Sequence, residues 1–298
     1  MTSKPAFKLI LVKPLTMARC NRLANMYVLS PFVWRDRGRW RIFVRAVPRR
    51  DDEPRLKMAE VWHGVSSDGY HFEMDAAPTI FPGPDLADLD GCEDPTVLPG
   101  KDGLRVWYTG FNQAQEKGRI MLARGALDAL EKVGVALDST KLFANPKEPT
   151  VVAADKGWRM MFEYARGGAS LIGEARAESL DGPWRDRKPG PIEPRAGSWD
   201  CWHLSPGPIV GEGSDAPAMF YNGATRDAEW RIGWALFDRD VSRVVARGEE
   251  PLISPDDTRD DGATDIAFAA SAVEHDGEIR IYFSQSDRDI RCAIVRRA

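Results

Sequence analysis

Five segments of the chain share one pattern of apolar and polar positions. In each segment, a small or acidic residue, usually followed by proline, opens a short apolar strand, and a polar turn then leads to a second apolar strand that ends in an aromatic side chain. The five copies span residues 30–43, 94–108, 148–164, 205–221 and 270–283. Pro31, Pro95, Pro149 and Pro206 mark four of the openings and Ser271 takes that place in the fifth, a period of roughly 55 to 65 residues.

This period is typical of a β-propeller in which each repeat forms one four-stranded blade. Third strands are predicted at 57–62, 120–124, 170–175, 231–236 and 290–295. The fifth repeat ends after three strands, so we expect residues 7–12 to supply its outer strand, close the ring and remove an open sheet edge. The predicted fold is an all-β, five-bladed β-propeller that occupies residues 1–298 as a single domain.

Composition narrows the classes of partner. The 41 basic residues against 45 acidic ones give a net charge of −4, which argues against nucleic acid and anionic membranes. Cys20, Cys92, Cys201 and Cys292 have no metal-binding spacing, so we expect free thiols and no metal site. The short aliphatic run at 9–12 is too short for a signal peptide or a membrane span, which predicts a cytoplasmic protein.

The residues that open the first strands are candidates for chemistry, because in a propeller the innermost strands line one central channel. Asp94 and Glu148 occupy this position in the second and third repeats, and Ser30 and Ser205 occupy it in the first and fourth. A pair of carboxylates across a channel suits the cleavage of a glycosidic bond, because one can protonate the leaving oxygen while the other activates the nucleophile. The alternative is structural, since an acidic residue before proline also caps turns.

Other candidates stand at the ends of the predicted strands. Residues 199–203 combine two tryptophans with Asp200 and His203, a mixture that suits a sugar pocket but also suits packing between blades. Arg45, Arg166 and Asp287 follow aromatic second strands, where an arginine also serves as an ordinary surface charge. There is no zinc-protease motif, P-loop, dinucleotide fingerprint or nucleophile elbow.

Several of these motifs together resemble glycoside hydrolase family 130. They are Glu93-Asp94-Pro95 and the segments 43–45, 164–166, 205–209, 220–223, 230–236 and 282–287. That family comprises five-bladed propellers that act on β-mannosides as inverting phosphorylases or hydrolases. Families 43, 32 and 62 share the architecture but usually place an aspartate base in the first blade, where this chain has Ser30-Pro31.

The resemblance implies roles for individual residues. Asp94 matches the proton donor of the family, Arg45 resembles an arginine that contacts the sugar, and Asp287 resembles an acid that binds substrate. Arg166 resembles one of the basic residues that hold phosphate in the phosphorylases. Asn222 stands where the phosphorylases have a histidine, and Phe143 and Cys201 align with two further basic phosphate ligands, so the departures favour hydrolysis over phosphorolysis.

The predicted function is therefore that of an inverting glycosidase acting on β-mannosides or related short oligosaccharides. Asp94 is the predicted general acid and Glu148 the predicted base, and Asp200 and Glu163 are the alternative candidates for the base. An inverting pair should stand about 6.5–9.5 Å apart. The predicted substrate-binding residues are Arg45, Tyr164, Arg166, Asp200, His203, Asn222, Arg231 and Asp287.

Two alternatives remain open. The first is a β-mannoside phosphorylase that uses inorganic phosphate as co-substrate, held by Arg166, Arg231, Lys147 and His203. The second is a propeller that binds glycans without cleaving them. No other cofactor is expected, and because relatives often form oligomers, a homo-oligomer is an open alternative to a monomer.

Overall fold

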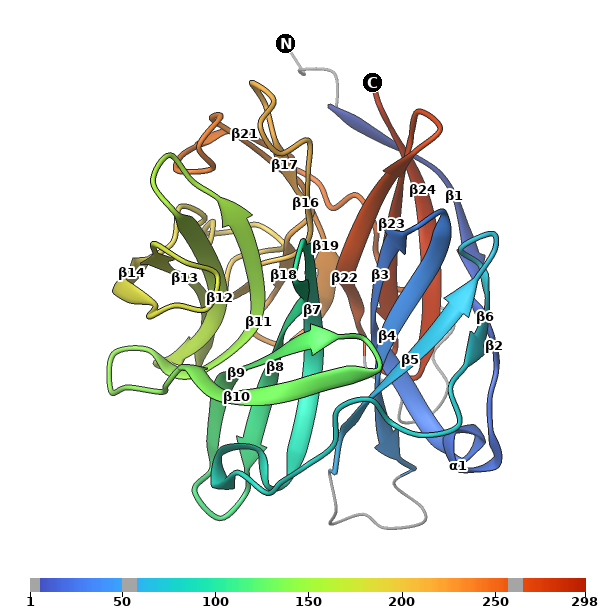
Figure 1. Cartoon of the computed structure of the whole chain (residues 1–298). Coiled ribbons are helices and arrows are strands. Elements are labelled where there is room, and N and C mark those ends of the chain that lie inside the picture. Colours follow the sequence, from blue (N-terminus) through green and yellow to red (C-terminus); the bar gives the residue numbers. More distant parts are fainter. Residues whose placement is uncertain (1–5, 50–57, 257–264) are drawn as a thin grey trace.

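The computed structural model of the chain describes residues 6–49, 58–256 and 265–298. Within these residues the chain consists almost wholly of β-strands (Figure 1), with one helical turn, α1 (Asn21–Ala24), and one 3₁₀ turn, η1 (Leu86–Asp88). The prediction of an all-β fold is confirmed. No helix in the described part is long and apolar enough to cross a membrane. All four cysteines lie among the described residues and are free thiols, as predicted.

The first three repeats each form one sheet, in which neighbouring strands of the repeat pair antiparallel. The first sheet contains β3 (Met26–Asp36), β4 (Arg39–Pro48), β5 (Glu60–Ser66), β6 (His71–Met74) and an added strand, β2 (Thr16–Ala18), which runs parallel to β6. The second contains β7 (Gly91–Gly100), β8 (Gly103–Asn112), β9 (Lys117–Ala126) and β10 (Ala129–Leu137). The third contains β11 (Ala144–Ala153), β12 (Trp158–Arg166), β13 (Ala169–Ala177) and β14 (Arg185–Pro189).

The fourth repeat is divided into two smaller sheets. One contains β15 (His203–Ser205), β18 (Asn222–Ala224) and β19 (Trp230–Ile232), and the other contains β16 (Ile209–Val210), β17 (Ala218–Met219), β20 (Ala235–Phe237) and β21 (Val244–Arg247). The division falls at Pro206-Gly207-Pro208, where two prolines lack the N–H groups that a continuous ladder needs.

The last repeat is completed by the N-terminal segment. Its sheet has the order β1 (Phe7–Pro14), β24 (Asp289–Arg297), β23 (Glu278–Gln285) and β22 (Ala267–His275). β1 pairs antiparallel with β24, which confirms the predicted outer strand. Phe7 anchors this strand, because its ring packs 5.1 Å from Phe220 and 5.5 Å from Trp234 of the fourth repeat.

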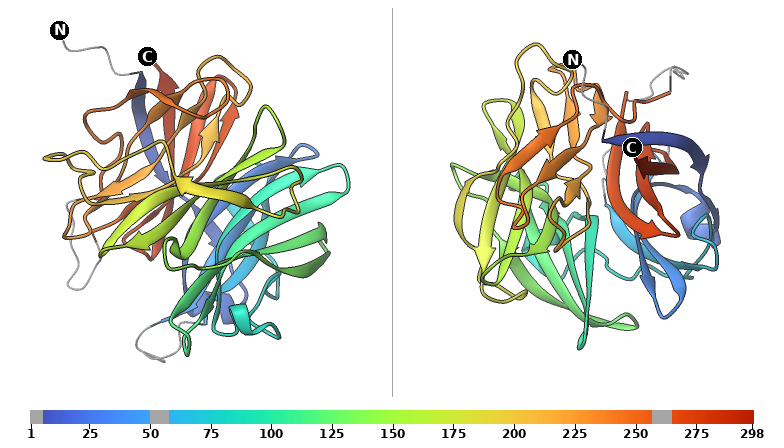
Figure 2. Two further views of the ribbon diagram at one scale, coloured as in Figure 1. Left: turned by 90° about the vertical axis from the view of Figure 1, so that its left-hand side faces the viewer. Right: turned by 90° about the horizontal axis from the view of Figure 1, so that it is seen from above.

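The sheets stand around a common centre (Figure 2), and five apolar clusters join them in a closed circle. The clusters lie between the first and second, second and third, third and fourth, fourth and fifth, and fifth and first repeats. Trp34 and Tyr108, for example, share the cluster between the first two repeats. Each sheet is therefore covered by apolar contacts on both of its faces.

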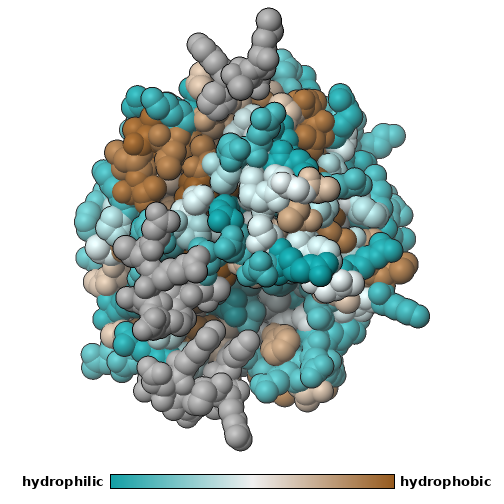
Figure 3. Space-filling view, turned by 180° about the vertical axis from the view of Figure 1, so that it is seen from behind, coloured by the Kyte–Doolittle hydropathy of each residue, from teal (hydrophilic) through white to brown (hydrophobic). Residues whose placement is uncertain are grey.

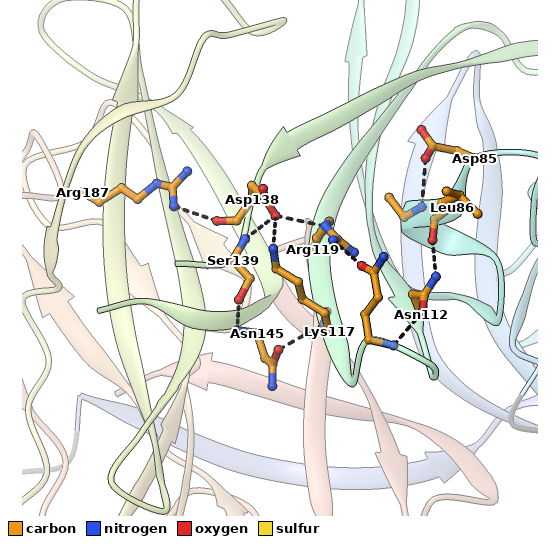
Figure 4. A network of polar contacts seen from close by, with 12 residues as sticks. Asp85, Leu86, Asn112, Lys117, Arg119, Asp138, Ser139, Asn145 and Arg187 are labelled. Carbon is orange, nitrogen blue, oxygen red and sulfur yellow. Dashed lines mark hydrogen bonds and ion pairs between the residues drawn. The ribbon is translucent and has the colours of Figure 1, made fainter. Parts of the chain in front are cut away.

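The outer surface is mainly hydrophilic, with apolar patches (Figure 3). One patch lies at the edge that β1 occupies, where Ile10, Leu11 and Val12 are 37–40% exposed. A polar network joins the second and third repeats (Figure 4). In it the Asp138 carboxylate accepts hydrogen bonds at 3.0 Å from Arg119 Nε and 3.2 Å from Lys117 Nζ, while Arg187 donates to the Asp138 carbonyl at 2.6 Å.

Candidate active site

Three residues that precede proline share one backbone conformation. Ser30, Asp94 and Glu148 have φ values of +50°, +49° and +50°, the left-handed region that residues other than glycine rarely adopt. Each lies where the pairing register of its strand shifts, in β3, β7 and β11 respectively. Such a bulge re-aims a side chain. The three repeats therefore turn equivalent side chains toward one place.

Asp94 is held by groups from the first repeat. Its Oδ1 accepts a hydrogen bond of 2.6 Å from the Ser30 hydroxyl and one of 3.2 Å from Arg45 Nη1. The residue is only 4% exposed. Arg45 also pairs through Nη2 with Glu93 Oε1 at 2.8 Å. Burial opposes the charged guanidinium, but the surrounding carboxylates outweigh it and raise the pKa of Arg45, so a fixed positive charge faces Asp94.

The side chains of Asp94 and Glu148 lie next to each other and influence each other's charge. Burial disfavours the Asp94 carboxylate, but Arg45 and the Ser30 hydroxyl outweigh that effect and lower the pKa of Asp94. Burial and the adjoining Asp94 charge raise the pKa of Glu148 well above its usual value. These opposite shifts favour the charged form of Asp94 and the neutral form of Glu148. This contact differs from the expected acid–base spacing of about 6.5–9.5 Å, because it leaves no room for a sugar and a water between the two groups.

A second group of polar residues lies beside Glu148. Lys147 Nζ pairs with Glu163 Oε1 at 3.2 Å, and the other Glu163 oxygen is buried without a hydrogen-bond partner among the described residues. The Lys147 side chain is 43% exposed. His203 Nδ1 accepts the Ser170 N–H at 3.1 Å, so Nε2 carries the proton of the neutral ring. Burial lowers the pKa of His203, and its electrostatic neighbours are Glu163 and Lys147.

The remaining charged candidates differ in how close they lie to Asp94 and Glu148. Asp287, in the turn after β23, is an electrostatic neighbour of Arg45 and helps to raise its pKa. Arg166 is exposed at the end of β12. Arg231 Nη2 pairs with Glu229 at 3.2 Å in its own repeat.

Three predicted substrate-binding residues have their side chains in the protein framework. Tyr164 is 1% exposed in the apolar cluster between the second and third repeats. Asp200 is fully buried and accepts hydrogen bonds from three side chains, those of Arg195, Tyr221 and Arg247. Asn222 is also fully buried and joins the fourth repeat to the fifth, because its amide bonds both the N–H and the carbonyl of Ala269.

Sequence reasoning did not single out Glu93 as a functional residue. Its position directly before Asp94 was visible, but its pairing with Arg45 depends on the contact between β4 and β7.

Among the described residues, no cluster of histidine, cysteine and acidic side chains is suited to hold a metal ion. The groups that the site does bring together are two neighbouring carboxyl groups, the Arg45 and Lys147 cations and hydrogen-bonding side chains.

Comparison with known proteins gives a consistent family. Residues 25–297 match the profile of glycoside hydrolase family 130, described as β-1,4-mannooligosaccharide phosphorylase. Among curated proteins, the chain is 25% identical over 293 residues to the 1,2-β-oligomannan phosphorylase of Thermoanaerobacter sp., covering 95% of each chain. It is 24% identical over 326 residues to the β-1,2-mannobiose phosphorylase of the same organism, covering 94% of this chain and 98% of that protein.

Solved structures agree on the fold. The β-1,2-mannobiose phosphorylase of Listeria innocua, in complex with β-1,2-mannobiose, superposes with a TM-score of 0.76 at 16% identity, over 98% of this chain and 92% of that one. A structure reported for family 130 glycoside hydrolases that target β-1,2 mannosidic linkages in Candida mannan superposes with a TM-score of 0.75 at 21% identity, over 90% and 84% of the two chains. Since the family profile spans almost the whole chain, this protein belongs to glycoside hydrolase family 130.

Proposed function

We propose that the protein cleaves β-mannosidic bonds in short oligomannosides by transfer to inorganic phosphate. The observation that carries the proposal is the buried Asp94 carboxylate, which is bonded by Ser30 and Arg45 and lies next to Glu148. Phosphorolysis is supported by the relatives, which are phosphorylases of β-1,2-linked mannosides along nearly the whole chain. On this point the sequence-based preference for hydrolysis gives way to its alternative.

Asp94 would deliver the proton that the leaving sugar oxygen needs. Arg45 stands beside it and Asp287 acts on Arg45, and both are groups that can bind sugar hydroxyls. Phosphate would approach the anomeric carbon from the opposite face, as a single displacement with inversion requires. The groups suited to receive it are Lys147, half-exposed beside the acid pair, and the Nε2–H of His203. Arg166 is an exposed arginine of the same repeat as Lys147 and would add a bidentate donor.

Hydrolysis is the second candidate, and a specific observation favours it. Glu163 has a buried oxygen without a hydrogen-bond partner among the described residues, next to neutral His203. Such an oxygen can accept a proton from water. The site also gathers several carboxylates around Arg45 and Lys147, which disfavours a phosphate dianion. A water molecule would not be repelled in this way.

Product analysis separates these candidates. The wild-type protein is incubated with β-1,2- and β-1,4-linked mannobiose and mannotriose, with and without inorganic phosphate. Mannose 1-phosphate that forms only with phosphate supports phosphorolysis, and free mannose at a rate independent of phosphate refutes it in favour of hydrolysis. Binding of these sugars without any product would support the glycan-binding alternative.

A substitution at Lys147 tests the acceptor site. We expect Lys147→Met to raise the KM for phosphate about tenfold or more, the value of one charge-assisted hydrogen bond, while the KM for the mannoside changes little. Arg231→Met is the matched control, because Arg231 pairs with Glu229 outside this group. An equal effect of both substitutions on phosphate would contradict the assignment of Lys147.

We also infer that the five repeats are the blades of one propeller, with the two small sheets of the fourth repeat forming a single interrupted blade. The circle of five apolar clusters supports this interpretation, because each cluster joins two successive repeats and the last joins the fifth to the first. The described residues would then form one unit, and a single cooperative unfolding transition is expected by calorimetry. Two separated transitions would contradict it.

A further inference from the structure

We infer that Glu148 stores the proton that Asp94 passes to the leaving sugar, and that it reloads from solvent between turnovers. The inference rests on the proposed function for its substrate, but the arrangement of the two carboxyl groups stands on geometry. It assigns to Glu148 a task different from the base expected from the sequence, because Glu148 acts through Asp94 and not on the attacking nucleophile.

The two side chains are brought together by equivalent bulges of neighbouring sheets. Asp94 and Glu148 each precede proline in the left-handed conformation, in β7 and β11. Directly behind them, the Thr96 hydroxyl donates a hydrogen bond of 2.6 Å to the carbonyl of Pro149 and ties the two strands together. The two bulges that carry the carboxyl groups are therefore tied to each other.

The charges around the pair are divided unequally. On the side of Asp94, Arg45 of β4 and the Ser30 hydroxyl of β3 both donate to the carboxylate. Glu148 faces the Asp94 charge and, from β12, Glu163, whereas Lys147 of its own strand favours a charged Glu148 but is itself paired with Glu163. The other charged groups that face Arg45 are Glu93 of β7 and Asp287 of the turn after β23. The negative charge of the pair therefore belongs on Asp94 and the proton on Glu148.

Exposure also differs between the two groups. Asp94 is 4% exposed, so it exchanges protons with bulk water poorly. Glu148 is only half-buried and is the more exposed of the two. A proton taken from water by Glu148 can pass along the shared hydrogen bond to Asp94 without solvent reaching the buried carboxylate.

The proton balance of the step is simple. As the bond between the anomeric carbon and the leaving oxygen breaks, Asp94 gives a proton to that oxygen and receives one from Glu148. An oxygen of hydrogen phosphate forms the new bond to the anomeric carbon, and the sugar phosphate later releases its remaining proton to solvent. Glu148 is left as a carboxylate and takes up a proton from water, which restores the starting state without any redox reagent.

Glu148→Gln tests the inference, because glutamine can still donate a hydrogen bond to Asp94 but cannot give up a proton. The matched control is Glu93→Gln, which removes one negative charge beside the same Arg45 and leaves the Asp94–Glu148 contact intact. Both variants are assayed on β-1,2-mannobiose, whose sugar leaving group needs a proton, and on 2,4-dinitrophenyl β-mannoside, whose phenolate leaves without one.

We expect Glu148→Gln to lose about a hundredfold or more in kcat on mannobiose, the range of general acid catalysis, and less than about tenfold on the dinitrophenyl mannoside. The wild-type rate on mannobiose should fall as the pH rises and Glu148 ionises, and this limb should be absent from the variant. Glu93→Gln should affect both substrates alike. Equal losses of Glu148→Gln on both substrates would overturn the inference, because a structural role or activation of the nucleophile affects every leaving group.

An infrared measurement tests the stored proton without any turnover. The wild-type protein at neutral pH should show the C=O stretch of a protonated carboxyl group, and the band should be lost in Glu148→Gln but retained in Glu93→Gln. If no mannoside is cleaved by the wild type, the proposed function fails, and the band then decides only whether Glu148 holds a proton beside Asp94. Absence of the band from wild-type protein that does cleave mannosides would refute the inference and leave the function standing.

Discussion

Removal of the Ser30 hydroxyl should destabilise the charged form of Asp94 by an amount that can be worked out from the structure. The hydroxyl donates a 2.6 Å hydrogen bond to Oδ1 of a carboxylate that is 4% exposed. A hydrogen bond to a charged group contributes about 1.5–3 kcal/mol. At about 1.36 kcal/mol per pKa unit, Ser30→Ala should raise the pKa of Asp94 by roughly one to two units.

The same change predicts how stability depends on pH. The pKa of Asp94 is lowered in the folded protein, so the stability that it contributes is present above its unfolded pKa of about 3.9 and is lost as the pH falls through the lower, folded value. The free energy of unfolding of Ser30→Ala should therefore be about 1.5–3 kcal/mol below that of the wild type at neutral pH. The difference should close in acid, as Asp94 becomes protonated in the folded state.

Ser30→Gly is the matched control, measured with Ser30→Ala by urea unfolding at a series of pH values. Both variants lack the hydroxyl, but glycine adopts the φ of +50° at this position without the steric cost that an L-residue has. The Ser30→Gly variant should be more stable than Ser30→Ala by about 1 kcal/mol at every pH. Both variants should show the same pH-dependent loss of unfolding free energy relative to the wild type. A loss that does not change with pH would refute the view that the hydroxyl stabilises a charge.

Three further substitutions test the framework of the site by chemical denaturation. Phe7→Ala should cost about 3–5 kcal/mol, because it empties an aromatic contact that holds β1 on the molecule, and a cost under about 1 kcal/mol would contradict that anchoring. Asn222→Ala should cost about 3 kcal/mol or more, because it leaves the buried N–H and carbonyl of Ala269 without partners, whereas a neutral effect would show that water replaces the amide. Gly207→Ala should destabilise by about 1–3 kcal/mol, because its Cβ would overlap the carbonyl oxygen of Phe220, and wild-type stability would show that the backbone there yields freely.

The repeat pattern predicted the position of the acid pair because a backbone device repeats with it. A residue before proline is kept out of the right-handed helical region, and a proline within a strand interrupts its ladder, so the motif indicates a bulge wherever it opens a strand. Ser30, Asp94 and Glu148 share that bulge, and their phase in the chain was enough to place them at one site. The closing strand was predictable for a similar reason, since a fifth repeat of three strands leaves one edge unpaired.

Side-chain partners were not predictable in the same way. Asp200 looked like a sugar ligand beside two tryptophans, but its partners Tyr221 and Arg247 lie 21 and 47 residues further along the chain. Tyr164 lies near the end of β12 and Asn222 opens β18, and both had looked like sugar ligands for the same kind of reason. Whether such a side chain faces the channel or the next sheet depends on the packing angle between repeats, and no local pattern reports that angle.

Side-chain hydrogen bonds link successive repeats around the centre of the molecule, and the acid site is a variant of these links. A bulge at proline leaves carbonyl groups without a ladder partner, and a side chain of an adjacent strand supplies the missing donor. These links are Ser271 to the Pro31 carbonyl at 2.8 Å, Thr96 to Pro149 at 2.6 Å, Thr150 to Gly207 at 2.9 Å and Asn222 to Ala269 at 3.1 Å. Between the first and second repeats the donor is Ser30, which stands two residues earlier in its repeat than Thr96 and Thr150 do in theirs, and its acceptor is the Asp94 carboxylate and not a backbone carbonyl. At the other links a side chain joins two strands, whereas the Ser30 hydroxyl stabilises a charge. Because the neighbouring links hold both strands in place, that charge is oriented before any substrate binds.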